Sequence, residues 1–391
     1  MSSRRELVFL ALARVTRSIA AGMINLAFPY YILTSFHHAP LVLGFIYVAA
    51  TLAGAGLSLL AGIGADIWGA RETLVATNLL LPLSAIMVYL SPSLWAIVPA
   101  AMIGSYASTG SLGGGGVGGV AQPAQSVMLA RLAPYRSRTG YFSLFTFIAG
   151  IAGALGALLG KVIAVRDIFL FAAIISAAGI PLLWCIRVDP KQGKLARLKA
   201  GRVIGRFTLT GMLNGFSQGL VVPFLIPFFI LVYHVPRSEM SVLAFAAGAL
   251  GSLSILGAPM LERKLGFVRS ILMTRGTALL LFVVFPFIRL LPLSEAIYLV
   301  VPSLRIAGLP IQQSELTKQV GDDEMGRALG INRVARLVAT SAGIAVSGHL
   351  MDGAHFEAPF FLYGLVMAAN LALYIKFFGA GRRPPDGTAA A

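Results

Sequence analysis

The sequence has little charge for its length and almost no cysteine. Only 12% of its 391 residues are charged and 57% are hydrophobic, whereas soluble domains are about 25% charged. This balance excludes an ordinary water-soluble enzyme, and the long apolar blocks exclude a disordered chain. The single cysteine, Cys185, excludes a disulfide framework and a cysteine-ligated zinc site. Acidic residues are also scarce, 15 against 31 basic ones, so the excess of positive charge needs an explanation.

Long apolar blocks dominate what is present. A helix needs about 20 apolar residues to cross a bilayer, and on this scale the chain divides into twelve blocks. The expected spans are 8–34, 41–63, 73–91, 95–121, 140–162, 168–187, 206–233, 240–260, 270–290, 296–315, 329–350 and 359–379. The sequence therefore predicts an all-α membrane protein with twelve transmembrane helices.

The placement of the basic residues supports this division independently. With the N-terminus inside, most Lys and Arg residues fall at cytoplasmic loops and helix ends, as membrane insertion favours. The expected organisation is an N-terminal six-helix bundle at 1–187, a cytoplasmic linker at 188–205, a C-terminal six-helix bundle at 206–379 and a cytoplasmic tail at 380–391. We expect a multi-pass protein of the cytoplasmic (inner) membrane with both termini in the cytoplasm. Topology then explains the positive charge, and no nucleic-acid partner is expected.

The two halves share short motifs in the same order. The Phe-Pro-Tyr-Tyr motif at 28–31, which ends the first span, matches the Ile-Pro-Phe-Phe motif at 226–229, which ends the seventh. A Pro-x-Gln motif at 123–125 likewise matches one at 310–312. These matches indicate two parallel, pseudo-symmetric repeats, an arrangement that places a substrate site near mid-membrane at their interface.

The loop after the second span carries a Gly-x-x-Ala-Asp-x-x-Gly-x-Arg pattern at 62–71, and Arg305-x-x-Gly308 follows in the tenth span. Through these motifs and the repeat, the sequence resembles the major facilitator superfamily over essentially its full length. The resemblance implies two bundles that rock about a central site. It also implies a conformational, gating role for the loop residues Gly62, Asp66, Gly69 and Arg71.

Arg305 lies near the middle of the tenth expected span. An arginine at that depth costs about 2.5–3.5 kcal/mol on insertion scales, so it should face the bundle interior and have a partner. The acidic residues are all expected at helix ends or in loops. The partner is therefore either a substrate anion or a set of carbonyls and side-chain amides, and the sequence leaves both open.

Polar side chains also recur at helical spacing on other spans. Arg14, Arg17 and Asn25 follow i, i+3, i+11 and share one face of the first span. Arg14 is expected to extend to the headgroups, whereas Arg17 is left open between that position and the cavity. In the resembled family, spans one, four, seven and ten line the central cavity. The candidate substrate-binding residues are Arg305, Asn25, Arg17, Asn214, Gln218, Gln122, Gln125 and Gln312.

No enzyme constellation or metal-ligand spacing is present, so the sequence predicts neither an enzyme nor a cofactor. It favours a secondary active or facilitative transporter of a small organic solute, with an anion preferred because of Arg305. One alternative is a multidrug exporter of neutral or amphiphilic compounds, and another is a transport-inactive membrane receptor. We expect a monomer in the lipid bilayer. A coupling proton or other ion stays open, because no carboxylate or histidine is expected at mid-depth.

Overall fold

The computed structural model describes residues 2–35, 39–106, 119–132, 138–186, 201–319, 322–353 and 355–379, and the regular structure of these ranges is helical. The helices of the first half are α1 (Ser2–Tyr30), α2 (Pro40–Ile67), α3 (Ala70–Leu90), α4 (Leu94–Gly104), α5 (Gln122–Leu132), α6 (Arg138–Leu159), α7 (Val165–Ala178) and α8 (Ile180–Trp184). Those of the second half are α9 (Gly201–Val221), α10 (Leu225–Leu231), α11 (Arg237–Leu265), α12 (Phe267–Val284), α13 (Leu291–Gln319), α14 (Asp322–Asp352) and α15 (Ala358–Phe378).

Eleven helical segments of the described ranges are long and apolar enough to cross a membrane. They coincide with eleven of the expected spans. The exception is the expected fourth span, 95–121. There the apolar helix α4 ends at Gly104, and the description resumes with a 3-10 turn, η3 (Gly119–Ala121), followed by α5. The chain turns at Ser105, which has a φ of 52°, so a single continuous helix over this span was a wrong prediction.

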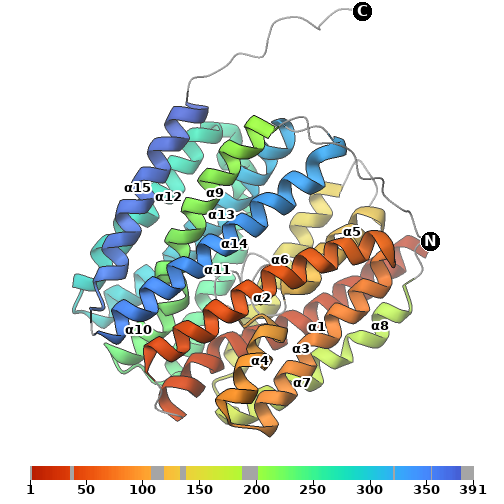
Figure 1. Ribbon diagram of the computed structural model, residues 1–391, viewed down its shortest axis with the longest axis horizontal. Helices are drawn as coiled ribbons and strands as arrows, with labels where there is room; N and C mark the ends of the chain where they lie inside the picture. Colours follow the sequence, from red (N-terminus) through yellow and green to blue (C-terminus); the bar gives the residue numbers. More distant parts are fainter. Residues whose placement is uncertain are drawn as a thin grey trace, which may run out of the picture.

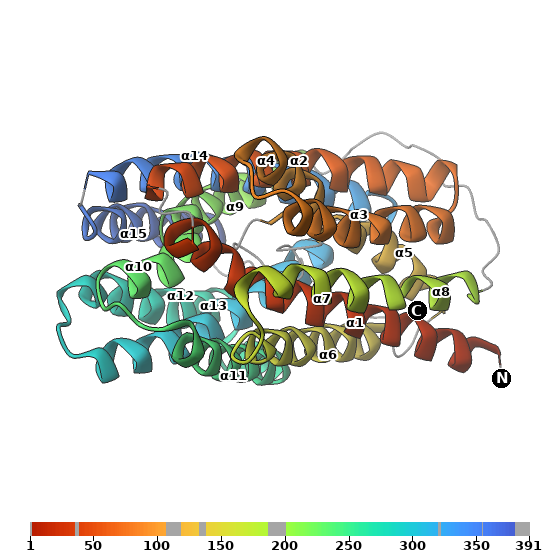
Figure 2. The same ribbon diagram turned by 90° about the horizontal axis from the view of Figure 1, so that it is seen from below.

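The two halves lie side by side, with the red-to-yellow helices on one side and the green-to-blue ones on the other (Figures 1 and 2). They meet along two helix pairs, α2 with α14 and α6 with α11. Within each half, the first span packs against the fifth, as α1 on α6 and α9 on α14. The repeat detected in the sequence is therefore reproduced in the packing.

Helix α1 begins and helix α15 ends at the same end of the bundle, which we name the terminal end (Figure 1). The opposite end, which we name the far end, holds the starts of α2, α7, α11 and α15. The start of α1 and the end of α15 thus lie on one side, as an even number of crossings between them requires.

Glycines bring the backbones of the paired helices into contact. A Cβ on Gly156 of α6 would overlap the carbonyl oxygen of Ile19 in α1, and one on Gly219 of α9 would overlap that of Thr340 in α14. Only glycine allows such an approach, and close packing of small residues is a main source of helix association in lipid. Close glycine contacts thus hold together the equivalent helix pair in each half.

Candidate substrate-binding site

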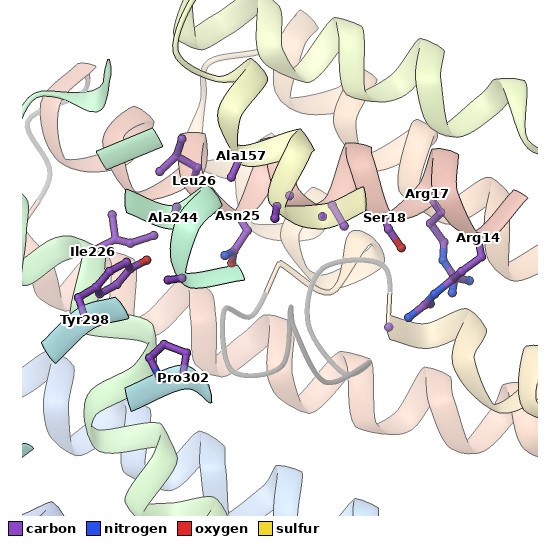
Figure 3. Close-up of a pocket in the computed structure, with 16 residues that line it drawn as sticks. Arg14, Arg17, Ser18, Asn25, Leu26, Ala157, Ile226, Ala244, Tyr298 and Pro302 are labelled. Carbon is purple, nitrogen blue, oxygen red and sulfur yellow. The ribbon is translucent and has the colours of Figure 1, made fainter. Parts of the chain in front are cut away.

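A cavity lies between the two halves, and its empty space together with the open solvent at its mouth amounts to about 760 Å³. The first half lines it with residues of α1, η3 and α6, and the second half with residues of α10, α11 and α13. Figure 3 shows Arg14, Arg17 and Ser18 near one another, Asn25 further along the same helix, and Tyr298 and Pro302 on the opposite wall. The cavity therefore combines side chains from both repeats.

Two arginines of α1 converge on one glutamine. Arg17, which is 3% exposed, donates from Nη2 to Oε1 of Gln125 at 2.7 Å and lies 3.5 Å from Oδ1 of Asn78 through Nη1. Arg14 donates from Nη1 to the same Gln125 oxygen at 3.4 Å. The described hydrogen-bond acceptors of these guanidinium groups are thus neutral amides.

The local sequence explains how Gln125 reaches this position. Pro123 falls in the first turn of α5, where proline is tolerated because the backbone N–H groups there have no helical partner. Helix α5 begins three residues after Gly119, which lines the cavity, and Gln122 and Gln125 lie in the first turn of this helix. This pair points to opposite halves, because Gln125 accepts from Arg17 of α1 and Gln122 accepts from Arg333 of α14 at 2.8 Å.

The second half contains an equivalent arginine–glutamine pair. Arg275 of α12, 3% exposed, donates from Nη2 to Oε1 of Gln312 at 2.6 Å, and its guanidinium lies 5.1 Å from the ring centroid of Tyr374. Gln312 is the repeat counterpart of Gln125, but neither Gln312 nor Arg275 is among the residues that line the cavity. The same hydrogen bond is therefore made in two different surroundings.

Of the predicted binding residues, Arg17 and Asn25 line the cavity. Arg14 lines it as well, so its expected extension to the headgroups was wrong. Its hydrogen bond to Gln125 of α5 holds it inside the bundle. The structure places Gln125 and Gln122 directly behind the cavity wall through their bonds to Arg17 and Arg333.

The other predicted residues lie outside the described lining of the cavity. Arg305 is half-buried on α13 and interacts electrostatically with Tyr363 and Arg275. Asn214 is buried within α9, and its Nδ2 has no hydrogen-bond partner among the described residues. Gln218 is half-buried one turn further on. A ligand-binding role for these residues stays a prediction.

Sequence reasoning missed three residues of these sites. Tyr298 lines the cavity from α13, and Asn78 and Arg275 belong to the two arginine–glutamine pairs. Arg275 is one of the basic residues counted among those at cytoplasmic loops and helix ends, but it is buried within α12. The repeat itself offered a signal, because Asn78 and Arg275 occupy equivalent places on the third span of each half.

The loop between α2 and α3 makes a tight connection at Gly69. Gly69 adopts a φ of 109° directly before α3, a conformation that favours glycine. The guanidinium of Arg71 lies 5.4 Å from the ring centroid of Trp184 in α8. Gly62 is half-buried, with open space where a side chain would be. The side chain of Asp66 lies outside the described residues.

Contacts between the halves lie near the far end. Tyr30 of α1 donates its hydroxyl to the carbonyl oxygen of Val235 at 2.9 Å. Gly44 of α2 meets Gly348 of α14 so closely that a Cβ on Gly44 would lie 3.0 Å from the other Cα. Towards the terminal end, the contact of Arg333 with Gln122 also joins the halves.

Within the described residues, no group of three or more His, Cys, Asp and Glu side chains gathers as potential metal ligands. The polar groups at the cavity are guanidinium, amide and hydroxyl groups. Such groups hold a solute by hydrogen bonds and charge.

Two membrane-embedded repeats around a central cavity form the architecture of solute transporters. The family model of the Major Facilitator Superfamily matches residues 10–314, so the chain belongs to this superfamily. The resemblance, the twelve-helix fold class and the role as a solute transporter rather than an enzyme are thereby confirmed.

Solved structures with low sequence identity share the fold. The human organic anion transporter MFSD10 is 15% identical with a TM-score of 0.66, over 96% of this chain and 100% of that one. The nucleoside transporter NupG is 13% identical with a TM-score of 0.73, over 96% and 100%. The xylose transporter XylE from E. coli is 14% identical with a TM-score of 0.74, over 98% and 100%. No curated protein matches the sequence.

Proposed function

We propose that this protein is a secondary active or facilitative transporter of a small organic solute, with an anion preferred, and that it works as a monomer by alternating access. The observation that carries the proposal is a cavity lined by residues of both repeats. A site at the junction of two repeats can open to either side when one repeat rocks against the other. Arg14 and Arg17 give this site positive charge.

The contacts between the halves support alternating access. The bond from Tyr30 to Val235 and the approach of Gly44 to Gly348 hold the far end closed. Movement of the solute to that side requires these contacts to separate. The excess of basic residues at the terminal end favours a cytoplasmic location for it, so we assign this end and both termini to the cytoplasm of a cell with a cytoplasmic (inner) membrane.

The cavity also bears on the driving force. The described residues that line it include no carboxylate and no histidine, the groups that most readily exchange a proton near neutral pH. This favours uniport or solute exchange. Coupling to an ion through Glu315 or Asp66, outside the described lining, is the remaining route.

The gating loop forms a separate part of the proposal. The family resemblance assigns Gly62, Asp66, Gly69 and Arg71 to conformational change, and the positive φ of Gly69 at the start of α3 fits a fixed, tight connection. We expect Asp66→Ala to lower the transport rate and leave membrane insertion intact. An unchanged transport rate would remove this role.

The principal alternative is an exporter of neutral or amphiphilic compounds. Leu26, Ile226 and Pro302 favour it, because they give part of the cavity an apolar wall. The two arginines count against cationic drugs. A transport-inactive receptor is the third candidate, and it predicts ligand binding without net movement of solute.

Uptake by proteoliposomes tests the proposal. Labelled organic acids, neutral solutes and amines are offered outside, with and without the same unlabelled solute inside. Alternating access predicts saturable uptake that internal solute accelerates. Ala244→Trp, which fills the cavity wall, should abolish uptake, whereas Leu250→Trp on the exposed face of the same helix should not. Uptake that survives Ala244→Trp would contradict transport through this cavity.

A further inference from the structure

The two ends of the cavity differ in chemistry. Arg14, Arg17 and Ser18 gather at one end, and Ile226, Tyr298 and Pro302 lie at the other (Figure 3). Asn25 lies between them on α1. The cavity is therefore polarised along α1, with its cationic end towards the terminal end of the bundle.

The cationic end carries more positive charge than its partners neutralise. The two guanidinium groups share a single amide oxygen, Oε1 of Gln125, at 2.7 and 3.4 Å. Nε of Arg14 is buried and has no hydrogen-bond partner among the described residues. Unpaired buried charge is costly, and the fork of donors on a guanidinium matches the oxygens of a carboxylate or a phosphate. This end is thus built for an oxyanion.

The middle of the cavity has a smooth wall of small residues. Ala21 and Gly22 of α1 form this wall together with Gly153, Ala154 and Ala157 of α6, and Gly22 packs directly against Gly153. These residues have no side chain that could hydrogen-bond a solute, and none that projects far into the space. A segment with this lining accepts a slender apolar body.

Beyond this wall of small residues the cavity again offers polar atoms, now uncharged. Asn25 lies eight residues beyond Arg17, which is about 12 Å along an α-helix. The hydroxyl of Tyr298 is directed into the cavity (Figure 3), and its ring is held edge-on to Phe229 at a centroid distance of 5.4 Å. An uncharged hydrogen-bonding group of a ligand would meet these side chains.

We propose that the solute is an elongated amphiphilic oxyanion. Its carboxylate or phosphate binds Arg14 and Arg17, its apolar body lies along the wall of α1 and α6, and a neutral hydroxyl or amide about 12 Å away contacts Asn25 and Tyr298. This inference rests on the proposed transport function. It assigns the anion site to α1, whereas the sequence alone pointed to Arg305.

Five probes of one chain length separate the features of this ligand. The probes are ω-hydroxyoctanoate, octanoate, monooctyl phosphate, octanamide and octylammonium, and their binding to the full chain in nanodiscs is measured by thermal stabilisation against empty nanodiscs. The inference predicts that the carboxylates or the phosphate bind at least about tenfold more tightly than octanamide, because a charge-assisted hydrogen bond contributes about 1.5–3 kcal/mol. The carboxylate and phosphate arms show which oxyanion the site prefers. Octylammonium should bind most weakly.

Variants locate the binding of each end of the probe. Arg17→Gln should remove the preference for octanoate over octanamide, and Arg17→Lys should restore part of it. Asn25→Ala and Tyr298→Phe should each remove the advantage of ω-hydroxyoctanoate over octanoate. Arg289→Gln, an exposed arginine away from the cavity, is the matched control for lost charge. A larger loss of octanoate binding with Arg305→Gln than with Arg17→Gln would overturn the assignment to α1.

The same probes in proteoliposomes distinguish failure of this inference from failure of the proposed function. Saturable uptake of octanamide or octylammonium that Ala244→Trp blocks, with no preference for the acids, would overturn the oxyanion and leave transport standing. Stabilisation by the acids with no movement of any solute would instead contradict transport. Equal binding of all five probes to the protein and to Arg17→Gln would also overturn the oxyanion.

Discussion

The two halves make the same arginine–glutamine hydrogen bond and use it differently. In the first half, Arg17 and Gln125 lie at the wall of the central cavity. In the second half, Arg275 and Gln312 lie outside the described lining, where Arg275 packs against the ring of Tyr374. The glutamines are repeat counterparts, while the arginines come from different spans.

The difference shows that a duplicated motif does not by itself assign a function. The Pro-x-Gln motif lies in the first turn of α5 in one repeat and inside the long helix α13 in the other, and it presents an amide to a guanidinium in both. Only the cavity makes one of the pairs available to a solute. The second pair is better explained as a tie between α12 and α13, because neither its donor nor its acceptor is among the residues that line the cavity.

The largest expected contrast comes from removing each arginine. Arg17→Gln should weaken binding of ω-hydroxyoctanoate about 10–100-fold, since charge-assisted hydrogen bonds are lost. Arg275→Gln should leave binding within about twofold but lower the free energy of unfolding by about 1–3 kcal/mol, because Gln312 loses its donor. Thermal shift with and without the probe measures both quantities. Equal loss of binding in the two variants would erase the contrast.

Equivalent glycines should, by contrast, respond alike in both halves. Gly156→Ala and Gly219→Ala each place a methyl group against a carbonyl oxygen of the neighbouring helix. Overpacking of this kind costs up to about 3 kcal/mol, visible as a lower melting temperature in nanodiscs. Gly56→Ala, where a Cβ would meet open space, is the control and should not destabilise. A lower melting temperature for only one of the two variants would show that the α1–α6 and α9–α14 contacts are not equivalent.

Replacing each glutamine by leucine compares the two arginine–glutamine pairs through a smaller change in stability. Gln312→Leu removes the described acceptor of Arg275 away from the cavity and should cost about 1–2 kcal/mol of stability. Gln125→Leu should lower the free energy of unfolding by less. The guanidinium of Arg17 still borders the cavity after this change, and its Nη1 still lies 3.5 Å from Oδ1 of Asn78. Chemical denaturation of both variants tests this order, and the reverse order would contradict it.

The smallest effect concerns a hydroxyl that one repeat has and the other lacks. Tyr30 bonds Val235 across the far end, whereas its counterpart Phe228 packs edge-on to Phe360 at 5.4 Å. Tyr30→Phe should weaken closure of the far end by about 0.5–1.5 kcal/mol. In a Cys185→Ala background with Ser18→Cys, labelling by an impermeant thiol reagent from the far side should then rise roughly two- to tenfold. Unchanged labelling would show that this bond does not hold the far end.

The fold could be predicted from the sequence because its signals are local. Length and hydropathy define a span without knowledge of its neighbours, and eleven spans agree with the structure. The fourth span was mispredicted because its apolar run hides a change of direction at Ser105, whose positive φ no apolar pattern reveals.

The candidate site was predicted less completely, for a physical reason. Spacing along α1 correctly put Arg17 and Asn25 on one face, since both belong to a single regular helix. Which way a helix such as α9 or α13 turns that face depends on the neighbours it packs against. Arg305 and Asn214 therefore could not be placed from the sequence, although Tyr298 and Pro302 on α13 do reach the cavity.

The contact between Arg333 and Gln122 has an electrical consequence. Arg333 lies within a membrane-spanning helix and joins the two halves. If the halves separate there during transport, its charge moves through part of the membrane's electric field. A full crossing of one charge is worth about 2.3 kcal/mol per 100 mV, so a shift through a tenth of the field contributes about 0.2 kcal/mol. Turnover should then depend on voltage even when the cargo carries no charge.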